Sequence, residues 1–564
     1  MRKMKRMLSQ MMAFALAATL VACSTGGTDS STTGAGSGDP TTNTSGTDGT
    51  GGTGDKVLSV QVDVEIASMD AQIATDGTSF EVIAATIEGL FSLDADGNTI
   101  PAIATDQTVS EDGLTRTFKL RDDAKWSNGE PVTAHDFVYA WTRLVDPDVG
   151  AQYGFIVGVA GIENADAIIA GEAELDTLGV KALDDHTLEI KLAFPVSFFD
   201  SLMTFPSFLP MNQKFMESVG ENYGTSAATL VSNSAFKVSA YEPAATVIEL
   251  VKNEDYYDAA SVSLDGLKFQ VVKDSQQAML SYQSGDLDVV TLAGEQIDLF
   301  KDDPDFRTVA AGYLWYISMN NLTDGLDNAA LRKAIAQSFD KTSIANTVLK
   351  DGSIPADFFV PIALATGPKG DDFRDDADTY LPFDATAAQA SLATAKSELG
   401  QDTFEFTMLV EDTESAINVA QVLKSQIETN LPGVTISLEQ MPKKNRLDRM
   451  RAGDYDLGLT RWGPDYADPM TYLELFVSDG PYNDGSWSNT DYDAIIASAK
   501  SGDLANDPEA RWDALKEAEG ILLDDAALAP VYQSAQAVMI NPAVSGIEFH
   551  SVGINRSYKN VKIN

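Results

Sequence analysis

The chain has 564 residues, 44% of them hydrophobic, and a formal net charge of -45 at pH 7. Acidic residues occur along the whole sequence, and this charge disfavours nucleic acid and anionic lipid surfaces as partners. We interpret most of these acids as a solvated surface. The length predicts two or three globular domains.

The amino terminus has the pattern of an export signal. Basic residues precede a short apolar stretch at 11–22, which is too short for a membrane-spanning helix of about 20 residues. The letters LVAC at 20–23 resemble the lipobox of bacterial lipoproteins. In such proteins the cysteine is lipidated, with palmitate among the attached lipids, and becomes the new amino terminus. We therefore expect residues 1–22 to be a lipoprotein signal peptide and Cys23, the only cysteine, to be the lipidation site.

Residues 23–55 are expected to be a lipidated cysteine followed by a flexible tether. The segment is rich in Ser, Thr and Gly and has almost no apolar side chains. Such a composition cannot bury enough surface to offset the entropy lost on ordering. The single cysteine also excludes an internal disulfide framework and, once lipidated, a free catalytic thiol. We expect attachment to the membrane through lipid alone, on the extracytoplasmic face.

The first elements of the folded part alternate between strand and helix. Residues 56–66 are predicted to form a strand, and residues 79–93 are predicted to form a helix from their apolar spacing. Asp96-Gly97 then predicts a hairpin turn. Later, the segments 404–412, 415–430 and 433–441 have the pattern of a β-α-β unit. Such units predict an α/β fold with a largely parallel sheet.

A second helix is predicted around residue 140. Thr133 and Asp136 have the spacing of a capping box, with Asp in place of the usual Glu or Gln. The residues of one helical face are Phe137, Ala140, Trp141 and Leu144. Core packing is the preferred interpretation of Trp126 and Trp141.

No motif of an enzyme is evident in the sequence. The P-loop, H-E-x-x-H and G-x-S-x-G patterns are absent. His135, His186 and His550 are the only histidines, and their spacing does not suggest metal ligation, so we expect surface or capping positions for them. We predict no catalytic residues, no metal and no cofactor, although the sequence leaves open a hydrolase with two placed carboxylates.

Four stretches together resemble a known family. They are residues 113–141, 250–274, 282–290 and 444–476, the last of which contains RWGPDYADP. They are similar, in order and spacing, to the solute-binding proteins of peptide ABC transporters, and most of all to oligopeptide-binding proteins of extracytoplasmic family 5. The resemblance runs from about Val57 to the end of the chain.

The resemblance implies an α/β, periplasmic-binding-protein-like clamshell with three domains. Domain I would be discontinuous, and the chain would cross between domains I and III near residues 310–316 and 529–533. The expected segments are 56–91, 190–311 and 532–564 for domain I, 92–189 for domain II, and 312–531 for domain III.

The resemblance also implies a ligand contact at the segment around Asp465. In the family, the first Asp of this motif pairs with the α-ammonium of a bound peptide, and flanking backbone adds the peptide as an extra strand. The motif residues carried over to this chain are Trp462, Gly463, Pro464, Asp465 and Tyr466. Asp468 is interpreted as a turn and surface residue.

Other family positions map onto distant parts of the chain. Residues Thr78, Ser79 and Phe80 would face the motif across the cleft. Asn233 matches a cleft position whose following Gly is replaced here by Ser234, and Tyr532 matches a tyrosine at a crossover. For Asp465, a turn or helix cap is the alternative to a ligand contact.

The resulting hypothesis is a monomeric, non-enzymatic receptor, lipid-anchored to the cell membrane, that captures oligopeptides and delivers them to an ABC permease. One alternative keeps the fold and changes the solute to a metal chelate, haem, opine or oligosaccharide. Another is a surface protein used in signalling or adhesion.

Overall fold

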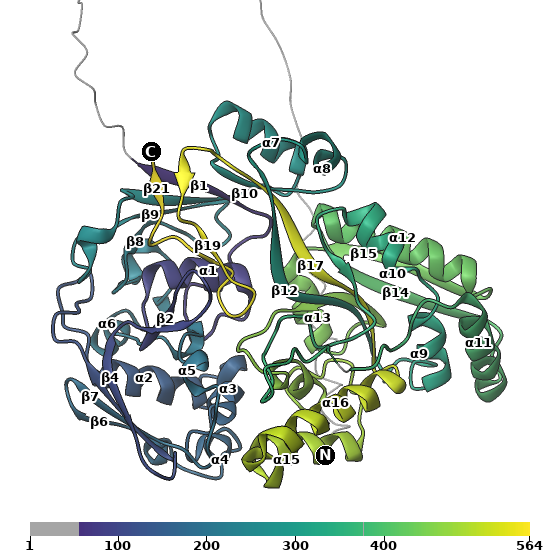
Figure 1. Cartoon of the computed structure of the whole chain (residues 1–564), viewed down its shortest axis with the longest axis horizontal. Coiled ribbons are helices and arrows are strands. Elements are labelled where there is room, and N and C mark those ends of the chain that lie inside the picture. The colour runs from purple at the N-terminus through teal and green to yellow at the C-terminus, as the bar shows by residue number, and fades with distance from the viewer. Residues whose placement is uncertain (1–55, 376) are drawn as a thin grey trace, which may run out of the picture. The chain divides into compact units, whose positions relative to one another are not determined.

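The computed structural model describes residues 56–375 and 377–564 (Figure 1). The predicted signal peptide, Cys23 and the tether lie outside these residues. Within the described part, no helix has the length and apolar character needed to cross a membrane.

One large sheet of eleven strands organises the described residues (Figure 1). Its strands lie in the order β15 (Val434–Met441), β14 (Phe404–Glu411), β16 (Leu457–Trp462), β12 (Phe306–Met319), β17 (Leu528–Ile540), β11 (Val289–Leu292), β1 (Val57–Val62), β10 (Gly266–Val271), β9 (Val247–Lys252) and β8 (Phe236–Ala240). The short β13 (Ile354–Pro355) pairs with β17 off this path.

The large sheet is mixed, so the expectation of a largely parallel sheet was wrong. The β-α-β unit is parallel as predicted, with β14 joined to β15 through α12 (Glu414–Asn430). However, β12 and β17 run antiparallel along most of their length, and β8, β9 and β10 follow one another through short antiparallel connections. Antiparallel neighbours need no helical crossover between them, and the sequence pattern of a single strand does not reveal the direction of its neighbours.

A second sheet has four strands, which come between β1 and β8 along the chain. Their order in the sheet is β4 (Ala104–Val109), β5 (Thr115–Leu120), β7 (Thr187–Lys191) and β6 (Val180–Asp184). Helix α2 (Ala134–Val145) packs on β6. Three pairs of short strands complete the described sheets: β2 (Phe91–Leu93) with β3 (Thr99–Pro101), β18 (Val544–Ser545) with β21 (Lys562–Ile563), and β19 (Glu548–Phe549) with β20 (Arg556–Ser557).

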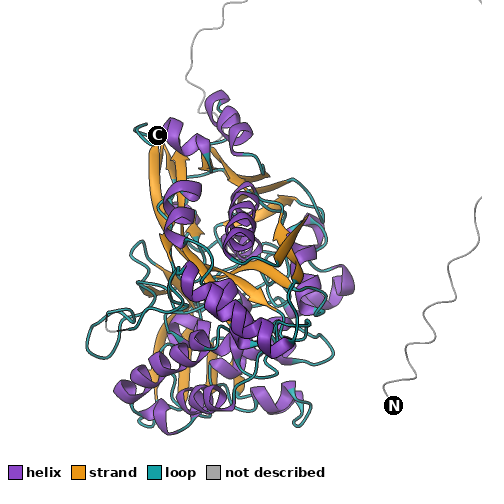
Figure 2. Cartoon of the chain, turned by 90° about the vertical axis from the view of Figure 1, so that its right-hand side faces the viewer, coloured by secondary structure: helices purple, strands orange, loops and turns teal. Residues whose placement is uncertain are grey.

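Helices cover the strands rather than forming a separate bundle (Figure 2). The remaining α-helices are α1 (Gly77–Thr86), α3 (Phe155–Val159), α4 (Ala165–Ile169), α5 (Phe199–Leu202), α6 (Gln213–Val219), α7 (Ser275–Ser284), α8 (Glu295–Phe300), α9 (Ala329–Ala336), α10 (Lys341–Ser343), α11 (Ala385–Leu399), α13 (Lys443–Arg451), α14 (Met470–Leu473), α15 (Thr490–Ser501) and α16 (Pro508–Asp524).

The expectations for α2 are confirmed. Thr133 and Asp136 form the capping box, and the predicted apolar face of the helix is buried. Trp126 and Trp141 are both fully buried. The indole N–H of Trp126 donates to Asp136, and that of Trp141 donates to the carbonyl of Phe208, so both polar atoms are satisfied inside the core.

The predicted helix at 79–93 is shorter than expected. Helix α1 ends at Thr86 because Ile87 adopts an extended conformation, and residues 91–93 instead form β2 of a hairpin around Asp96-Gly97. Gly89 lies against the carbonyl of Met203 and the side chain of Leu209, a tight approach that a larger residue would disturb. Apolar residues are buried both before and after the end of α1 at Thr86. The spacing of apolar residues therefore does not show where the helix ends.

One histidine expectation was wrong. His550 is 7% exposed, and both of its ring nitrogens lack a hydrogen-bond partner among the described residues. Burial lowers the pKa of His550 below its ordinary value, which favours a neutral imidazole.

Candidate ligand-binding site

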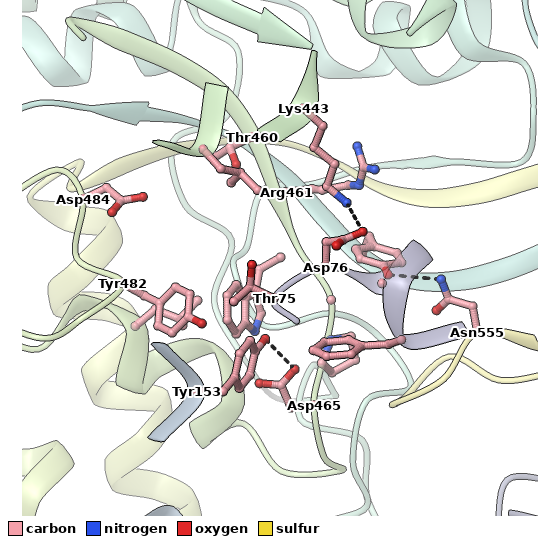
Figure 3. A pocket seen from close by; sticks show the side chains of 18 of the residues that line it. Thr75, Asp76, Tyr153, Lys443, Thr460, Arg461, Asp465, Tyr482, Asp484 and Asn555 are labelled. Atoms are coloured by element: carbon pink, nitrogen blue, oxygen red, sulfur yellow. Dashed lines mark hydrogen bonds and ion pairs between the residues drawn. The ribbon is translucent and has the colours of Figure 1, made fainter. Parts of the chain in front are cut away.

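A cavity of about 80 Å³ lies where segments from distant parts of the sequence meet (Figure 3). Its walls come from the start of α1, the turn around Tyr153, strand β12, helix α13, the end of β16 with the loop that follows, the loop around Asp484, and the chain near Asn555. No single segment could form this cavity by itself.

Strand β16 places Asp465 at the cavity. The strand pairs with β12 as far as Trp462, which lies opposite Leu314. Two backbone contacts then fix the loop that follows: the N–H of Gly553 donates to the carbonyl of Pro464 at 2.9 Å, and the N–H of Asp465 donates to the hydroxyl of Thr471 at 3.0 Å. These two contacts hold the backbone from which the Asp465 side chain extends.

Asp465 is a buried carboxylate without a cationic partner in the described part of the chain. It is 6% exposed, and its Oδ1 accepts a hydrogen bond of 3.2 Å from the Tyr153 hydroxyl. Burial raises the pKa of Asp465 well above its ordinary value; the hydrogen bond from Tyr153 opposes this shift, and the charge of Glu474 adds to it. A buried carboxylate held by one neutral donor is a favourable position for a ligand cation.

Aromatic rings surround this carboxylate. Tyr153 stacks on Trp462 with ring centroids 6.3 Å apart, and Tyr482 contacts both rings edge-on at 5.6 and 4.9 Å. Phe80 closes another side, 5.7 Å from Tyr153. The Trp462 indole N–H and the Tyr482 hydroxyl are buried without a hydrogen-bond partner among the described residues. The ring faces of this wall attract a cation, and the Trp462 N–H and the Tyr482 hydroxyl are available to hydrogen-bond a ligand.

Glycine is required where the loop passes Tyr313. A side-chain carbon added at Gly463 would lie 2.4 Å from the Tyr313 ring, and one added at Gly77 would lie 2.1 Å from its hydroxyl. The Tyr313 hydroxyl also accepts a hydrogen bond of 3.1 Å from Asn555. Tyr313 is therefore wedged between α1 and the loop of Asp465.

The opposite wall is basic. Lys443 lies 3.6 Å from Asp76, the residue that caps α1. Arg446 and Arg461 both pair with Glu411, which is fully buried. Two guanidinium groups on one carboxylate leave an excess of positive charge on this side.

A second cavity, about 140 Å³, adjoins the first. The two share five wall residues: Gly77, Tyr313, Lys443, Arg461 and Asn555. Together they form a cleft with a carboxylate end at Asp465 and a more basic centre.

The structure brings seven of the ten candidate peptide-binding residues to this cleft. Phe80, Trp462, Gly463, Pro464 and Asp465 line the first cavity. Thr78 and Tyr532 line the second.

Three candidate residues line neither cavity. Ser79 donates to Asp76 at 2.6 Å within the cap of α1, and Tyr466 stacks on Phe198 with ring centroids 4.7 Å apart. Asn233 exchanges side-chain hydrogen bonds with the backbone of Glu88. These three residues therefore make contacts within the protein instead of lining the cleft.

The interpretation of Asp468 as a surface turn residue was wrong. Asp468 is 7% exposed and forms two hydrogen bonds of 2.8 Å with the guanidinium of Arg511. It also accepts the N–H of Met470 at the start of α14. This ion pair ties the loop after Asp465 to helix α16.

Sequence reasoning missed several wall residues. Tyr153, Tyr313, Lys443, Arg461 and Asp484 all line the first cavity. Only Arg461 had an available signal, since it immediately precedes the recognised Trp462. In the described residues, no group of three His, Cys, Asp or Glu side chains is arranged to hold a metal ion.

An α/β unit with an internal cleft, walled by several distant segments and carrying the buried carboxylate of Asp465, has the features of a solute-binding protein. Residues 98–484 match the model of "Bacterial extracellular solute-binding proteins, family 5 Middle". The chain belongs to this family of bacterial extracellular solute-binding proteins, as the motifs around Asp465 predicted.

Similar proteins carry names of peptide-binding proteins. The chain is 32% identical to a dipeptide-binding protein of Lactococcus lactis over 522 residues, which covers 90% of this chain and 94% of that protein. It is 31% identical to the oligopeptide-binding protein OppA of Bacillus subtilis over 545 residues, covering 94% of each.

A solved structure confirms the fold class. Listeria monocytogenes OppA bound to peptide superimposes with a TM-score of 0.86 at 36% identity, and the match covers 91% of this chain and 99% of that one. The predicted α/β architecture of the periplasmic-binding-protein type is therefore confirmed.

Proposed function

We propose that this protein is a receptor that captures peptides in the cleft at Asp465 and delivers them to an ABC permease. The observation that carries the proposal is the buried carboxylate of Asp465, which has one neutral donor and no cation among the described residues. A peptide with a free amino end supplies the missing cation. The names of the relatives, which bind dipeptides and oligopeptides, support the same ligand class.

The peptide amine would take the place opposite Tyr153 at Asp465. An ammonium that enters the closed site loses its hydration, and the fixed carboxylate and the ring faces offset that loss. The carboxylate needs no reorganisation because the backbone contacts of Pro464 and Thr471 already hold its loop.

The edge of β16 offers backbone groups for the rest of the peptide. Strand β14 pairs with β16 only at Leu457 and Gly458, so in the described part the β14 side of the strand is unpaired from there to Trp462. An extended peptide would add to such an edge through main-chain hydrogen bonds, which do not depend on the peptide's sequence. Residues 78–80 would contact it from the other side.

We further propose the three-domain division with segments 56–91, 190–311 and 532–564 for domain I, 92–189 for domain II, and 312–531 for domain III. The four-strand sheet falls in the second of these domains except for the last two residues of β7, and β14, β15 and β16 lie within the third. Strands β12 and β17 would connect domains I and III.

Anchoring completes the proposed role. Lipidation at Cys23 and a tether through residue 55 would hold a monomeric, non-enzymatic receptor at the outer face of the cell membrane. Labelling with a radioactive fatty acid would test the anchor, because Cys23→Ala should abolish incorporation of label and release the protein from the membrane.

Binding of matched peptides tests the receptor function. Native mass spectrometry of the purified protein should detect bound peptides, and calorimetry should show that acetylating a peptide's amino end weakens binding. Asp465→Ala should cost about 2–5 kcal/mol with the free peptide, as for a desolvated charge pair. Equal affinity for the free and acetylated peptides, or co-purification of a different solute alone, would overturn the proposal.

A further inference from the structure

A second carboxylate, Asp484, lines the same cavity as Asp465. It lies on the loop between the short helical turn Glu474–Phe476 and α15, and it is half-buried. Figure 3 shows Tyr482 between Asp484 and the pair formed by Tyr153 and Asp465. Burial raises the pKa of the Tyr482 hydroxyl, and the charges of both carboxylates add to that shift.

The loop fixes the backbone on both sides of Asp484. The Asn483 side chain donates to the carbonyls of Val477 and Trp487 at 3.1 and 2.7 Å and accepts the N–H of Trp487 at 3.2 Å. The carbonyl of Gly485 accepts two hydrogen bonds from Asn321, at 2.8 and 3.0 Å. Asp484 itself forms no hydrogen bond with the described residues, so a rigid loop presents a carboxylate that structural bonding does not use.

The nearby cations do not neutralise this carboxylate. Arg446 is 1% exposed and pairs with Glu411, while its Nε has no partner among the described residues. Arg451 also lines the cavity, but no carboxylate in the described part lies within 4.0 Å of its guanidinium nitrogens. Burial raises the pKa of Asp484 to about 6, and the charges of Arg451 and Arg446 oppose this shift without cancelling it.

The cavity therefore holds two carboxylates, Asp465 and Asp484, that lack a cationic partner within the described residues. A single peptide amine satisfies only one of them. Asp484 feels the charges of Arg446 and Arg451 only at longer range, and a ligand cation would give it the direct partner that it lacks.

We propose that Asp484 binds the ammonium or guanidinium group of a basic side chain close to the amino end of the peptide, so that the receptor prefers peptides with Lys or Arg at the first or second position. This inference rests on the proposed function and names its substrate class. The Tyr482 ring would contact the aliphatic part of such a side chain and, with its face, the charge itself.

Two pairs of peptides test the preference. In each pair lysine is exchanged for norleucine, at position 1 in one pair and at position 2 in the other, with all other residues identical. Calorimetry at pH 7.5 should show at least tenfold tighter binding of the lysine peptide in one pair. Asp484→Asn should reduce the affinity for that lysine peptide to that for its norleucine twin.

A control variant lies on the same loop. Asp479 is exposed and outside the cavity, and Asp479→Asn should leave the lysine preference unchanged. Loss of the preference in Asp479→Asn, or its survival in Asp484→Asn, would overturn the inference.

The pH dependence gives a readout that a folding defect would not mimic. The groups facing Asp484 are Arg446, Arg451, Tyr316, Tyr455 and Tyr482, and burial raises the pKa of the three tyrosines above its ordinary value. Asp465 lines the same cavity, but its titration acts equally on both peptides of a pair and cancels in their ratio. The ratio of lysine to norleucine affinity should fall as the pH drops below about 6 in the native protein and stay flat in Asp484→Asn.

The outcomes separate this inference from the proposed function. If the norleucine peptide binds through its free amine and lysine brings no gain at either position, only the role of Asp484 is wrong. If no peptide binds, or acetylation has no effect, the receptor function itself fails.

Discussion

The hydroxyl of Tyr153 donates a hydrogen bond to the carboxylate of Asp465 at 3.2 Å, and this contact joins residues 312 positions apart in the sequence. Tyr153 also stacks on Trp462, three residues before the carboxylate. One neutral donor only partly replaces the water that Asp465 would have in solution. A ligand cation would supply the remaining interactions. The affinity for that cation therefore depends on the hydrogen-bonding capacity of Asp465 that Tyr153 does not use.

Removing the Tyr153 hydroxyl should weaken peptide binding less than removing the charge of Asp465. Tyr153→Phe keeps the ring wall and loses one hydrogen bond, worth about 0.5–1.5 kcal/mol. Asp465→Asn loses the charge pair, and its cost should exceed tenfold in Kd. Calorimetry with a norleucine-containing peptide measures both variants at pH 7.5. An equal loss in the two variants would contradict the assignment of Asp465 as the principal contact.

Peptide affinity should fall as the pH is lowered. The pKa of Asp465 in the free protein is raised well above its ordinary value by burial, and only the ionised carboxylate pairs with an amine. Protons therefore compete with the ligand as the pH drops through that raised pKa. Titration calorimetry with a norleucine-containing peptide isolates this effect from Asp484. Asp465→Asn and an acetylated peptide should both give flat profiles, and a slope in either would point to another titrating group.

Glu411 should contribute to stability through its two arginines. Burial alone would raise the pKa of Glu411, but the charges of Arg461, Arg446 and Lys443 lower it from 4.5 to about 2. The folded pKa is below the unfolded one, so the stabilisation is present above pH 4.5 and is lost as the pH falls toward 2. The shift corresponds to about 3 kcal/mol at most.

The matching substitution is Glu411→Gln, which leaves two buried guanidinium groups unpaired. We expect it to lower the free energy of unfolding by about 3–5 kcal/mol at pH 7, measured by urea denaturation. Glu439→Gln is the control, because Glu439 pairs with Arg449 at an exposed position and should change stability by less than about 1 kcal/mol. Similar losses in the two variants would refute the role of burial.

Gly463→Ala should displace Tyr313. The added carbon would lie 2.4 Å from the Tyr313 ring, closer than packed atoms allow, and the ring is held on its other side by Gly77. We expect a lower Tm and weaker peptide binding. The double variant Gly463→Ala with Tyr313→Ala removes the clash, so its loss of stability should be smaller than the sum of the two single losses. Strict additivity would show that the glycine serves another purpose.

The sequence predicted the part of the site that is continuous along the chain. Trp462, Gly463, Pro464 and Asp465 form one contiguous segment, and the family resemblance of that segment was specific enough to select one acid among 84. The core position of Trp141 agrees with the predicted apolar face of its helix and the capping box before it, which are local properties.

The rest of the site depends on tertiary contacts that leave no local pattern. Tyr153 lies in an ordinary turn, and nothing near it in the sequence indicates that it meets Asp465. The sequence around Asp484 is typical of a surface loop. Only the structure shows that Asn483 and Asn321 fix the residues next to it. The break after Thr86 and the burial of His550 likewise arise from packing partners far along the chain.

The contributions of Gly553 and Asn555 to the cavity wall set an order of events during synthesis. Helix α1 is made well before the residues that it meets there: Asn555, which donates to Tyr313, and Tyr558, which donates to Glu81 on that helix. These contacts of α1, and this part of the cavity wall, therefore form only after the later segment has been made. A truncated chain would retain the Asp465 motif and still lack a finished binding site.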